Sequence, residues 1–256
     1  MAVMDLFRLD EKIAVVTGGY RGLGLMMAEG LAEAGAHVVL CARNLDACER
    51  AALAIAETGV QALAVRCDVS SPNDVRVLVE RTLSRFGRLD ILVNSAGYIW
   101  EEPFEKVSLE KWNRTFSANA TGVFLCCQAA GRQMILQGAG RIINIASAAG
   151  LASVDPELSD SVPHSASKGA VIALTRDLAR KWSRHGIQVN AIAPGWFGPR
   201  TSADPTERRS QRTIDAIPMK RLGEKDDIKG VAVFLASPAS RYVSGQVLAV
   251  DGGILA

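Results

Sequence analysis

The sequence predicts an α/β fold: a single domain built on one parallel, doubly wound sheet of about seven strands flanked by helices. Three observations lead to this prediction. Short runs rich in β-branched residues alternate along the chain with longer helical stretches. These runs are continuously apolar, which is typical of strands covered on both faces. At 256 residues, 48% of them hydrophobic, the chain is long enough to bury one substantial core.

The expected strands are short, and most are followed by enough residues for a helix. They are residues 12–17, 37–42, 61–66, 90–97, 141–147, 187–195 and 246–250. The first helix is expected to run to about Ala34, because Gly35 fits a C-terminal stop. No linker or change of composition divides the chain, so one domain over residues 1–256 is predicted.

One long irregular segment runs from Gly195 to about Pro218 and is rich in Gly, Pro, Thr, Arg and Ser. Loops of that length inside compact domains are usually lids or binding loops. We therefore expect a substrate lid over about residues 195–218.

The charge and hydropathy of the chain exclude several classes of partner. With 29 basic and 27 acidic residues and no block of like charges, a nucleic-acid partner is not expected. No apolar run approaches the roughly 20 residues that span a bilayer, and the N-terminus "MAVMDLFRLDEK" is charged too early for a signal peptide. We expect a soluble, cytoplasmic protein.

The cysteines are odd in number and lack metal-ligand spacing, so no metal site is expected. They are Cys41, Cys48, Cys67, Cys126 and Cys127. We interpret them as small buried thiols in a reducing compartment.

A glycine-rich turn, "TGGYRGLG" at residues 17–24, joins the first expected strand to the first helix. Gly18, Gly22 and Gly24 would let the backbone approach a pyrophosphate at the N-terminus of that helix. The spacing is G-x-x-x-G-x-G and no Lys-Ser/Thr pair follows, so this is not a P-loop for nucleoside triphosphates. Taken alone, the turn also fits a purely structural role.

The stretch "VPHSASK" places His164 and Lys168 four positions apart, so on a helix their side chains share one face. Upstream, the run "RIINIAS" delivers Ser147 at its end. A serine–histidine hydrolase is not favoured, because no G-x-S-x-G elbow surrounds this serine. We expect His37 to serve in packing and His185 as a favourable charge at a helix C-terminus.

Several motifs occur in register: the glycine turn, "NSAG" at 94–97, Ser147, the "HSASK" stretch and "PG" at 194–195. With them the chain resembles the short-chain dehydrogenase/reductase family, from about Leu9 to the C-terminal "VDGG", and within it the gluconate 5-dehydrogenase-like and 3-oxoacyl-reductase-like branch. The resemblance implies a Rossmann-type fold and hydride transfer between a nicotinamide and a ketone or secondary alcohol. It also implies assembly into a homotetramer or homodimer.

The end of the second expected strand indicates which nicotinamide cofactor would bind. An NAD(H) site places a carboxylate there, whereas this chain has Ala42 followed by Arg43. A guanidinium suits the 2′-phosphate of NADP(H), and Arg21 in the glycine turn supports the same preference. With the resemblance, the expected cofactor-binding residues are Gly18, Arg21, Gly22, Leu23, Gly24, Arg43, Asp68, Val69, Asn94, Ala96, Gly97, Lys168, Pro194, Gly195 and Phe197. Asp68 could instead cap the following helix.

The resemblance also implies a catalytic set, and one position departs from the family pattern. In the family a tyrosine hydroxyl exchanges the proton, and a serine holds the substrate oxygen. A lysine bonds the ribose and lowers the phenol pKa, while an asparagine supports a water relay. The matching residues here are Asn119, Ser147 and Lys168, but His164 occupies the tyrosine position.

An imidazole in place of a phenol changes the acid–base chemistry. The lysine ammonium would lower the pKa of a phenol from near 10, but it disfavours imidazolium and so opposes proton donation to a carbonyl. A neutral imidazole is better matched as the base for alcohol oxidation. Its Nε2 also lies about 2 Å closer to the backbone than a phenol oxygen, so we expect a bridging water.

Three interpretations of His164 stay open at this point. It is a natural variant acid/base, an engineered replacement of tyrosine, or the mark of a family member that binds NADP(H) without turnover. Because Asn119, Ser147 and Lys168 all remain, an oxidoreductase is favoured over the non-catalytic binder.

By resemblance, residues 97–104, 148–163 and the lid form the substrate pocket. Its candidate apolar walls are Trp100, Trp196 and Phe197, and its candidate polar contacts are Glu101, Glu102, Arg200 and Arg208. Many relatives carry a threonine or serine four residues past the glycine of "PG", where it bonds the nicotinamide carboxamide. Pro199 occupies that place, so Thr201 or a backbone group would take over the contact.

Overall fold

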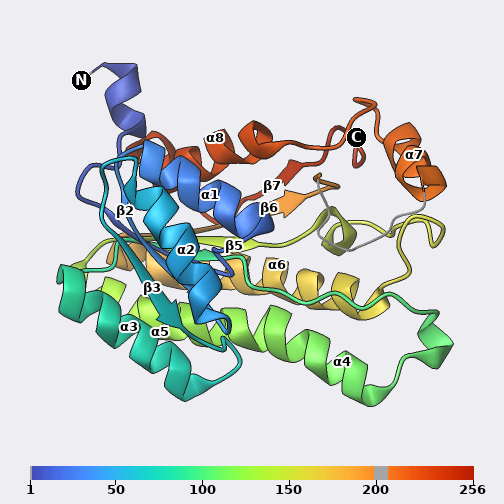
Figure 1. Ribbon diagram of the computed structural model, residues 1–256, viewed down its shortest axis with the longest axis horizontal. Helices are drawn as coiled ribbons and strands as arrows, with labels where there is room; N and C mark the ends of the chain where they lie inside the picture. Colours follow the sequence, from blue (N-terminus) through green and yellow to red (C-terminus); the bar gives the residue numbers. More distant parts are fainter. Residues whose placement is uncertain (1, 199–206) are drawn as a thin grey trace.

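The computed structural model describes residues 2–198 and 207–256, apart from the side chains of residues 207–210. Its centre is a seven-stranded sheet in the order β3-β2-β1-β4-β5-β6-β7 (Figure 1). Every neighbouring pair of strands is parallel. The predicted parallel, doubly wound sheet is therefore confirmed.

The strands lie where the continuous apolar runs predicted them. They are β1 (Ile13–Thr17), β2 (His37–Ala42), β3 (Ala62–Arg66), β4 (Ile91–Asn94), β5 (Gly140–Ile145), β6 (Ile187–Pro194) and β7 (Val247–Val250). Three of them end earlier than predicted: β6 by one residue, at Pro194, and by more, β4 at Asn94 and β5 at Ile145. The residues beyond these ends form loops at the carboxyl edge of the sheet, and Ala96, Gly97 and Ser147 lie in those loops.

Helices cover both faces of the sheet (Figure 1). One face packs against α1 (Gly22–Glu33), α2 (Leu45–Ala56) and α8 (Lys225–Ala236), and the other against α3 (Pro72–Phe86), α5 (Gly122–Gln137) and α6 (Val162–Trp182). The remaining α-helices are α4 (Leu109–Phe116) and α7 (Glu207–Ala216). Short 3₁₀ turns occupy Val3–Phe7, Phe104–Lys106, Ala148–Gly150, Ser183–His185 and Pro238–Ser240.

The helix ends follow local sequence signals. The α1 helix ends at Glu33, and Gly35 beyond it has φ +102°, as its predicted role as a stop requires. The side chain of Asn44 caps α2, and that of Ser71 caps α3.

A π-helical turn at Ser117–Thr121 joins α4 to α5. Such turns are rare in helices and are frequent at functional sites. Here the turn contains Asn119, which is fully buried. No local feature of the sequence predicts this irregularity.

The five cysteines are unpaired and buried, as predicted. In the described part of the chain, no group of three or more His, Cys, Asp or Glu residues is placed to hold a metal ion. None of the helices described by the structure is both long and apolar enough to cross a membrane.

Candidate active site

A cleft of about 700 Å³ opens at the carboxyl ends of the strands. It lies beside β1 and β4, where the strand order reverses, and ligands of open α/β sheets bind at such a point. The predicted site residues that line it are Gly18, Arg21, Gly22, Leu23, Gly24, Arg43, Asp68, Val69, Ala96, Gly97, Ser147, His164, Lys168, Pro194 and Gly195. The fold thus brings together motifs that lie far apart in the chain.

The glycine turn leads from β1 into α1. Gly18 has φ +66° and Gly22 has φ +53°, angles that glycine adopts at little cost. A Cβ on Gly24 would lie 2.5 Å from the Gly18 carbonyl oxygen, so only glycine fits the close approach of the helix to the turn. Because the first residues of α1 line the cleft, its N-terminal N–H groups are available to an anion.

Thr17, at the end of β1, connects the glycine turn to the "NSAG" loop. Its Oγ1 accepts hydrogen bonds from the backbone N–H groups of Ser95 and Ala96, each at 3.0 Å. This bridge holds the two loops that form the floor of the cleft. Sequence reasoning missed Thr17, although its place at the end of a strand beside the glycine turn was a usable signal.

Asn94 was predicted to lie along the cofactor, but its side chain does not line the cleft. It is 2% exposed, and its Nδ2 donates to Asn144 Oδ1 at 2.9 Å and to Cys127 Sγ at 3.3 Å. Asn94 is still part of β4, so its side chain points to one face of the sheet instead of beyond its end. It links β4 to β5, and only the following residues reach the cleft.

Arg43 and Asp68 lie at the end of the cleft formed by β2 and β3. Asp68 Oδ1 accepts from the hydroxyl and the N–H of Ser70 at 2.7 and 3.0 Å. These bonds, with a smaller contribution from the charge of Arg43, lower the pKa of the Asp68 carboxyl. The alternative that Asp68 caps the following helix is not supported, because Ser71 is the N-cap of α3.

Asn119 sits behind the cleft at the centre of a polar network. Its Oδ1 accepts from the N–H of Tyr98 at 2.7 Å. Its Nδ2 donates to the carbonyl of Tyr98 at 2.9 Å and to Ser167 Oγ at 3.0 Å, and lies 3.5 Å from His164 Nδ1. The side-chain amide therefore has a defined orientation, with its nitrogen toward the histidine ring.

His164 and Lys168 lie one turn apart on α6, and both line the cleft. Lys168 is 5% exposed, and its Nζ donates to the carbonyl of Ile145 at 2.5 Å. Burial lowers the pKa of Lys168 to about 8. Ser147 lies at the end of β5, and its Oγ accepts from the N–H of Ala149 at 3.2 Å. The predicted serine, histidine and lysine thus meet in one cleft.

The loop after Gly97 is held to the segment before α6. Ser161 Oγ donates to the carbonyl of Trp100 at 2.6 Å. Trp100 Nε1 and Lys111 Nζ both donate to Glu102, at 3.0 and 2.7 Å, and Lys111 chiefly lowers the pKa of that carboxyl. Glu101 accepts from Ser159 Oγ at 2.9 Å. Of the four candidate polar contacts, Glu101 and Glu102 thus hold the loop in place.

Phe197 was predicted to bind the cofactor, but it does not line the cleft. Its backbone bridges to Gly223, and a Cβ on that glycine would lie 2.7 Å from its ring. Phe197 and Trp196 line a separate cavity with Met219 and Arg221. The structure does not describe Pro199, Arg200 and Thr201 or the side chain of Arg208, so the expectations for these residues lie outside the described part.

The two remaining histidines lie away from the cleft. The His37 ring stacks on Phe86 with 5.9 Å between centroids, and its Nδ1 accepts from the N–H of Gln61 at 3.1 Å. This agrees with the predicted packing role. His185 ends the 3₁₀ turn that follows α6, at the predicted helix end.

Some cleft residues have no counterpart in the sequence prediction. They include Asn44, Ser70, Arg114, Ser117 and Ala118. The Arg114 guanidinium lies over the Tyr98 ring, 4.5 Å from its centroid. Arg114 belongs to α4, and only the packing of this helix against the "NSAG" loop brings it to the cleft.

Comparisons with known proteins agree with this geometry. The family model described as Enoyl-(Acyl carrier protein) reductase matches residues 18–255. Gluconate 5-dehydrogenase of Gluconobacter oxydans (strain 621H) is 40% identical over 262 residues, which cover 99% of this chain and 98% of the relative.

Two solved structures are similar over almost the whole chain. A short-chain type dehydrogenase/reductase from Mycobacterium marinum superposes with a TM-score of 0.94 at 37% identity, covering 99% of both chains. A gluconate 5-dehydrogenase from Burkholderia cenocepacia J2315, solved in complex with NADP and tartrate, gives 0.92 at 38% identity, also covering 99% of both chains.

Proposed function

Because this chain belongs to the short-chain dehydrogenase/reductase family, we propose that it is an NADP(H)-dependent oxidoreductase. Its substrate would be a ketone or a secondary alcohol, with His164 in the position of proton transfer. The observation that carries this proposal is the single cleft running from Arg43 past the glycine turn to Ser147, His164 and Lys168.

The residues of the cleft fit a phosphorylated dinucleotide. A Cβ on Gly22 would have no neighbour within 4 Å, and the open space beside this glycine of the cleft allows a pyrophosphate to approach the backbone. Arg21 and Arg43 supply two cations at the adenosine end, where an NAD(H) site would carry an acid. When bound, the nicotinamide supplies or accepts the hydride. The similar structure solved with NADP supports the same choice.

Lys168 would bind the cofactor and Ser147 the substrate at the reacting end of the cleft. The Lys168 ammonium, buried beside the end of β5, would hold the ribose hydroxyls. The Ser147 hydroxyl would hold the substrate oxygen. Neither role requires either residue to change its protonation state.

His164 would exchange the proton with the substrate oxygen. Its Nδ1 lies 3.5 Å from the Asn119 amide nitrogen, whose two N–H groups donate to the carbonyl of Tyr98 and to Ser167 Oγ, so this contact orients the ring without fixing its tautomer. Nε2, the nitrogen at the tip of the ring, would exchange the proton with the substrate, directly or through one water. Asn119 would thus act as a positioning residue for the ring.

The competing hypothesis is a protein that binds NADP(H) without turnover. The retained Asn119, Ser147 and Lys168, together in one site, favour the enzyme. The test measures NADPH binding by calorimetry and carbonyl reduction by loss of NADPH absorbance, for the natural chain and for His164→Tyr. We expect both forms to bind NADPH and the tyrosine form to reduce ketones faster.

The outcomes separate the hypotheses. Turnover in the tyrosine form alone would mean that His164 disables the enzyme. Binding in both forms without turnover in either would favour the non-catalytic protein. Absence of binding by folded protein would reject the proposal as a whole.

Arg43 offers a test of the cofactor preference. We expect Arg43→Ala to weaken NADPH binding at least about tenfold and to leave NADH binding nearly unchanged, because only NADPH carries the 2′-phosphate. Arg50→Ala, an exposed arginine on α2 away from the cleft, is the matched control. Equal losses for both cofactors in Arg43→Ala would contradict the assignment.

We further propose a homotetramer or homodimer in the cytoplasm, with a lid over about residues 195–218. Exposed apolar side chains support an assembly, among them Leu109 at 73%, Leu136 at 83% and Tyr242 fully exposed. Sedimentation equilibrium tests the assembly directly, and a monomer at micromolar concentration would reject it.

A further inference from the structure

A second, smaller cavity of about 80 Å³ lies next to the candidate active site. Two of its lining residues, Ala148 and Trp196, directly follow residues of the cleft, Ser147 and Gly195, along the chain. Its apolar walls include Ala148, Val154, Leu158, Trp196, Ile254 and Leu255. A substrate whose oxygen lies at Ser147 therefore has an apolar recess within reach of its adjoining carbon atoms.

The walls of this cavity are held by local hydrogen bonds. The N–H groups of Leu158 and Ser159 donate to the carbonyl of Asp155 at 2.9 and 3.0 Å. At the C-terminal wall, Asp251 accepts from the N–H groups of Gly253 and Leu255 at 2.9 and 3.1 Å. The recess is thus formed by ordered turns of the chain.

The size and lining of the cavity limit what it can hold. An apolar cavity of about 150 Å³ holds benzene and stays free of water. A recess of about 80 Å³ therefore suits roughly three to four carbon atoms. Its polar side chains, Ser153 and Asp155, are both exposed, so an apolar arm would pack against the other, apolar walls.

The charges around the cavity disfavour an anionic substrate. Asp155 lines it, and Glu157 and Asp160 follow on the same segment. The nearby Arg212 already pairs with Glu157 at 2.8 Å. Among the described residues that line the cavity there is no Lys, Arg or His. A substrate carboxylate would meet like charge there, without a counter-ion among the lining residues that the structure describes.

We propose that the substrate of this site is a neutral ketone, or the corresponding alcohol, whose short apolar arm of about three to four carbon atoms occupies this cavity. This inference rests on the proposed oxidoreductase function. It separates the chain from relatives that are named for gluconate.

The test compares two ketones of equal chain length, 2-hexanone and 5-oxohexanoate, which differ in a terminal methyl or carboxylate group. The kcat/KM with NADPH is measured for the natural chain and for His164→Tyr. We expect at least about a tenfold preference for 2-hexanone in every form that turns over. Equal values, or a preference for the carboxylate, would overturn the inference while leaving the oxidoreductase function intact.

If neither form of the protein turns over, substrate binding is measured instead. Calorimetry of the NADP⁺-bound protein compares 2-hexanol with 5-hydroxyhexanoate. Preferential binding of 2-hexanol without turnover in either form would support the cavity assignment and reject catalysis. Absence of 2-hexanol binding to protein that does bind NADP⁺ would overturn the cavity assignment.

Leu158→Ala tests the cavity itself. We expect it to lower kcat/KM for 2-hexanone about tenfold and to leave the value for acetone nearly unchanged, because acetone does not reach the recess. Val154→Ala serves as a second variant should the first fold poorly. Leu53→Ala, an exposed leucine on α2, is the control and should change neither value. An equal loss for both ketones would count against the assignment.

Discussion

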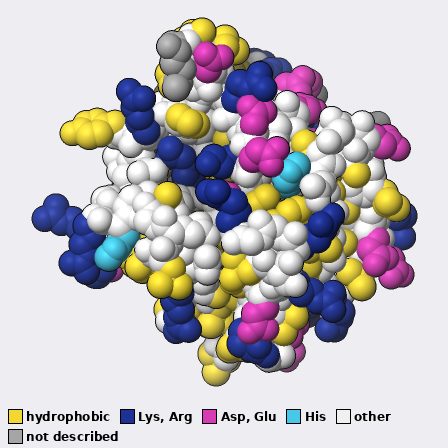
Figure 2. Space-filling model, turned by 90° about the vertical axis from the view of Figure 1, so that its left-hand side faces the viewer, with side chains coloured by type: hydrophobic (Ala, Val, Ile, Leu, Met, Phe, Trp, Pro, Cys, Tyr) yellow, Lys and Arg dark blue, Asp and Glu magenta, His cyan; other side chains and the backbone are white. Residues whose placement is uncertain are grey.

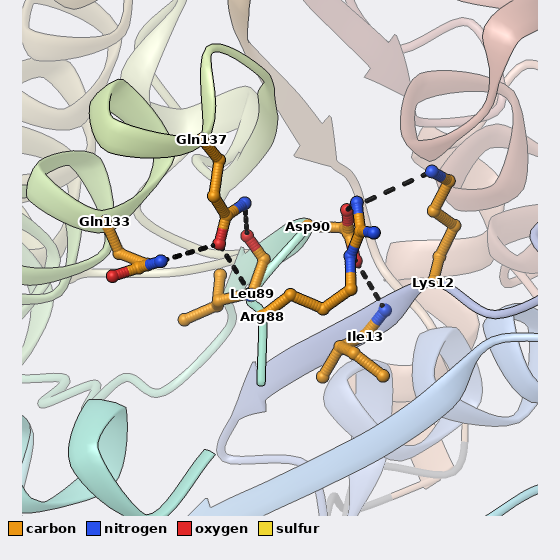
Figure 3. A network of polar contacts seen from close by, with 7 residues as sticks. All are labelled: Lys12, Ile13, Arg88, Leu89, Asp90, Gln133 and Gln137. Carbon is orange, nitrogen blue, oxygen red and sulfur yellow. Dashed lines mark hydrogen bonds and ion pairs between the residues drawn. The ribbon is translucent and has the colours of Figure 1, made fainter. Parts of the chain in front are cut away.

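The two ends of the sheet both carry charged side chains, yet these are satisfied in different ways. Lys and Arg side chains gather near the centre of the face shown in Figure 2. At the amino ends of the strands, Asp90 accepts from Arg88 Nε at 2.8 Å and from the N–H of Ile13 at 3.0 Å (Figure 3). Lys12 Nζ lies 4.0 Å from the same carboxylate. These groups satisfy one another.

At the carboxyl ends of the strands the polar groups converge on an open cleft instead. The N-terminus of α1, Arg43, Ser147 and Lys168 line the same space. Lys168 has lost most of its water and pairs with no carboxylate in the described part of the chain, so burial lowers its pKa to about 8. The difference indicates where a ligand is expected to bind. The polar groups at the amino edge pair with one another, whereas those at the carboxyl edge leave N–H donors and a cationic side chain for a bound anion.

The largest effect is expected where a ligand must approach the backbone. In Gly24→Ala the new Cβ would lie 2.5 Å from the Gly18 carbonyl oxygen, so the turn has to shift. We expect NADPH affinity to fall more than about 100-fold, equal to about 3 kcal/mol, as measured by calorimetry. Unchanged affinity would remove the glycine turn from the proposed binding site.

Gly230→Ala is the matched control for that change. Gly230 lies within α8, and a Cβ there would have no neighbour within 4 Å. We expect unchanged NADPH affinity and a gain of about 0.5–1 kcal/mol in the free energy of unfolding, because alanine is the better helix former.

Asp90→Ala should have the opposite effect to Gly24→Ala: a loss of stability without a loss of NADPH affinity. The side chain of Asp90 is only 9% exposed, and its removal leaves Arg88 and the N–H of Ile13 without their acceptor. We expect a loss of about 2–3 kcal/mol in urea unfolding, with NADPH affinity unchanged in the folded protein.

Asp10→Ala is the control at the same edge. The ion pair of Asp10 with Arg8 is exposed on both sides, so its loss should leave the unfolding midpoint unchanged. A shift as large as that of Asp90→Ala would mean that burial of the carboxylate is not the cause.

The pH dependence of the free energy of unfolding tests whether Lys168 is desolvated. Its pKa is lowered from 10.5 to about 8 in the folded apo-protein, so between these values the unfolded chain binds more protons. The free energy of unfolding should therefore rise with pH in this window, by about 2 kcal/mol between pH 7.5 and 10. Lys168→Met, which keeps the apolar stem, should lack this rise. Parallel pH profiles for the two forms would show that the lysine is not desolvated.

The fold was predictable because the signals for it are local. Strands buried on both faces appear as continuous apolar runs, and the exposed amino edge and the loops do not disturb that pattern. The ends of β4 and β5 were less predictable, because the residues just beyond them, Ser95, Ala96 and Ala146, are small and fit a strand as well as a loop. A sequence pattern does not show where pairing stops.

The candidate site was predictable where it depends on glycine spacing or helix periodicity. The glycine turn and the pair of His164 and Lys168 are of this kind. The orientation of the Asn94 and Phe197 side chains could not be predicted. The direction of a side chain depends on whether its residue still belongs to a strand and on what packs beside it. Arg114 reaches the cleft only through the packing of α4, which no local pattern encodes.

The smallest effect expected concerns the side chains that tie a helix end to the amino edge. Gln137 accepts from the N–H of Leu89 at 3.1 Å and donates to its carbonyl at 2.9 Å, while Gln133 only supports Gln137 (Figure 3). Gln137→Ala should lower the free energy of unfolding by about 1 kcal/mol, because it leaves two backbone groups without partners.

Gln133→Ala should lower the free energy of unfolding by less than half as much as Gln137→Ala, because it removes a single hydrogen bond between two partly exposed side chains. NADPH affinity should stay constant in both variants. If either glutamine variant weakened NADPH binding, the two ends of the sheet would be energetically coupled, and the division between a self-satisfied edge and a ligand-dependent edge would no longer hold.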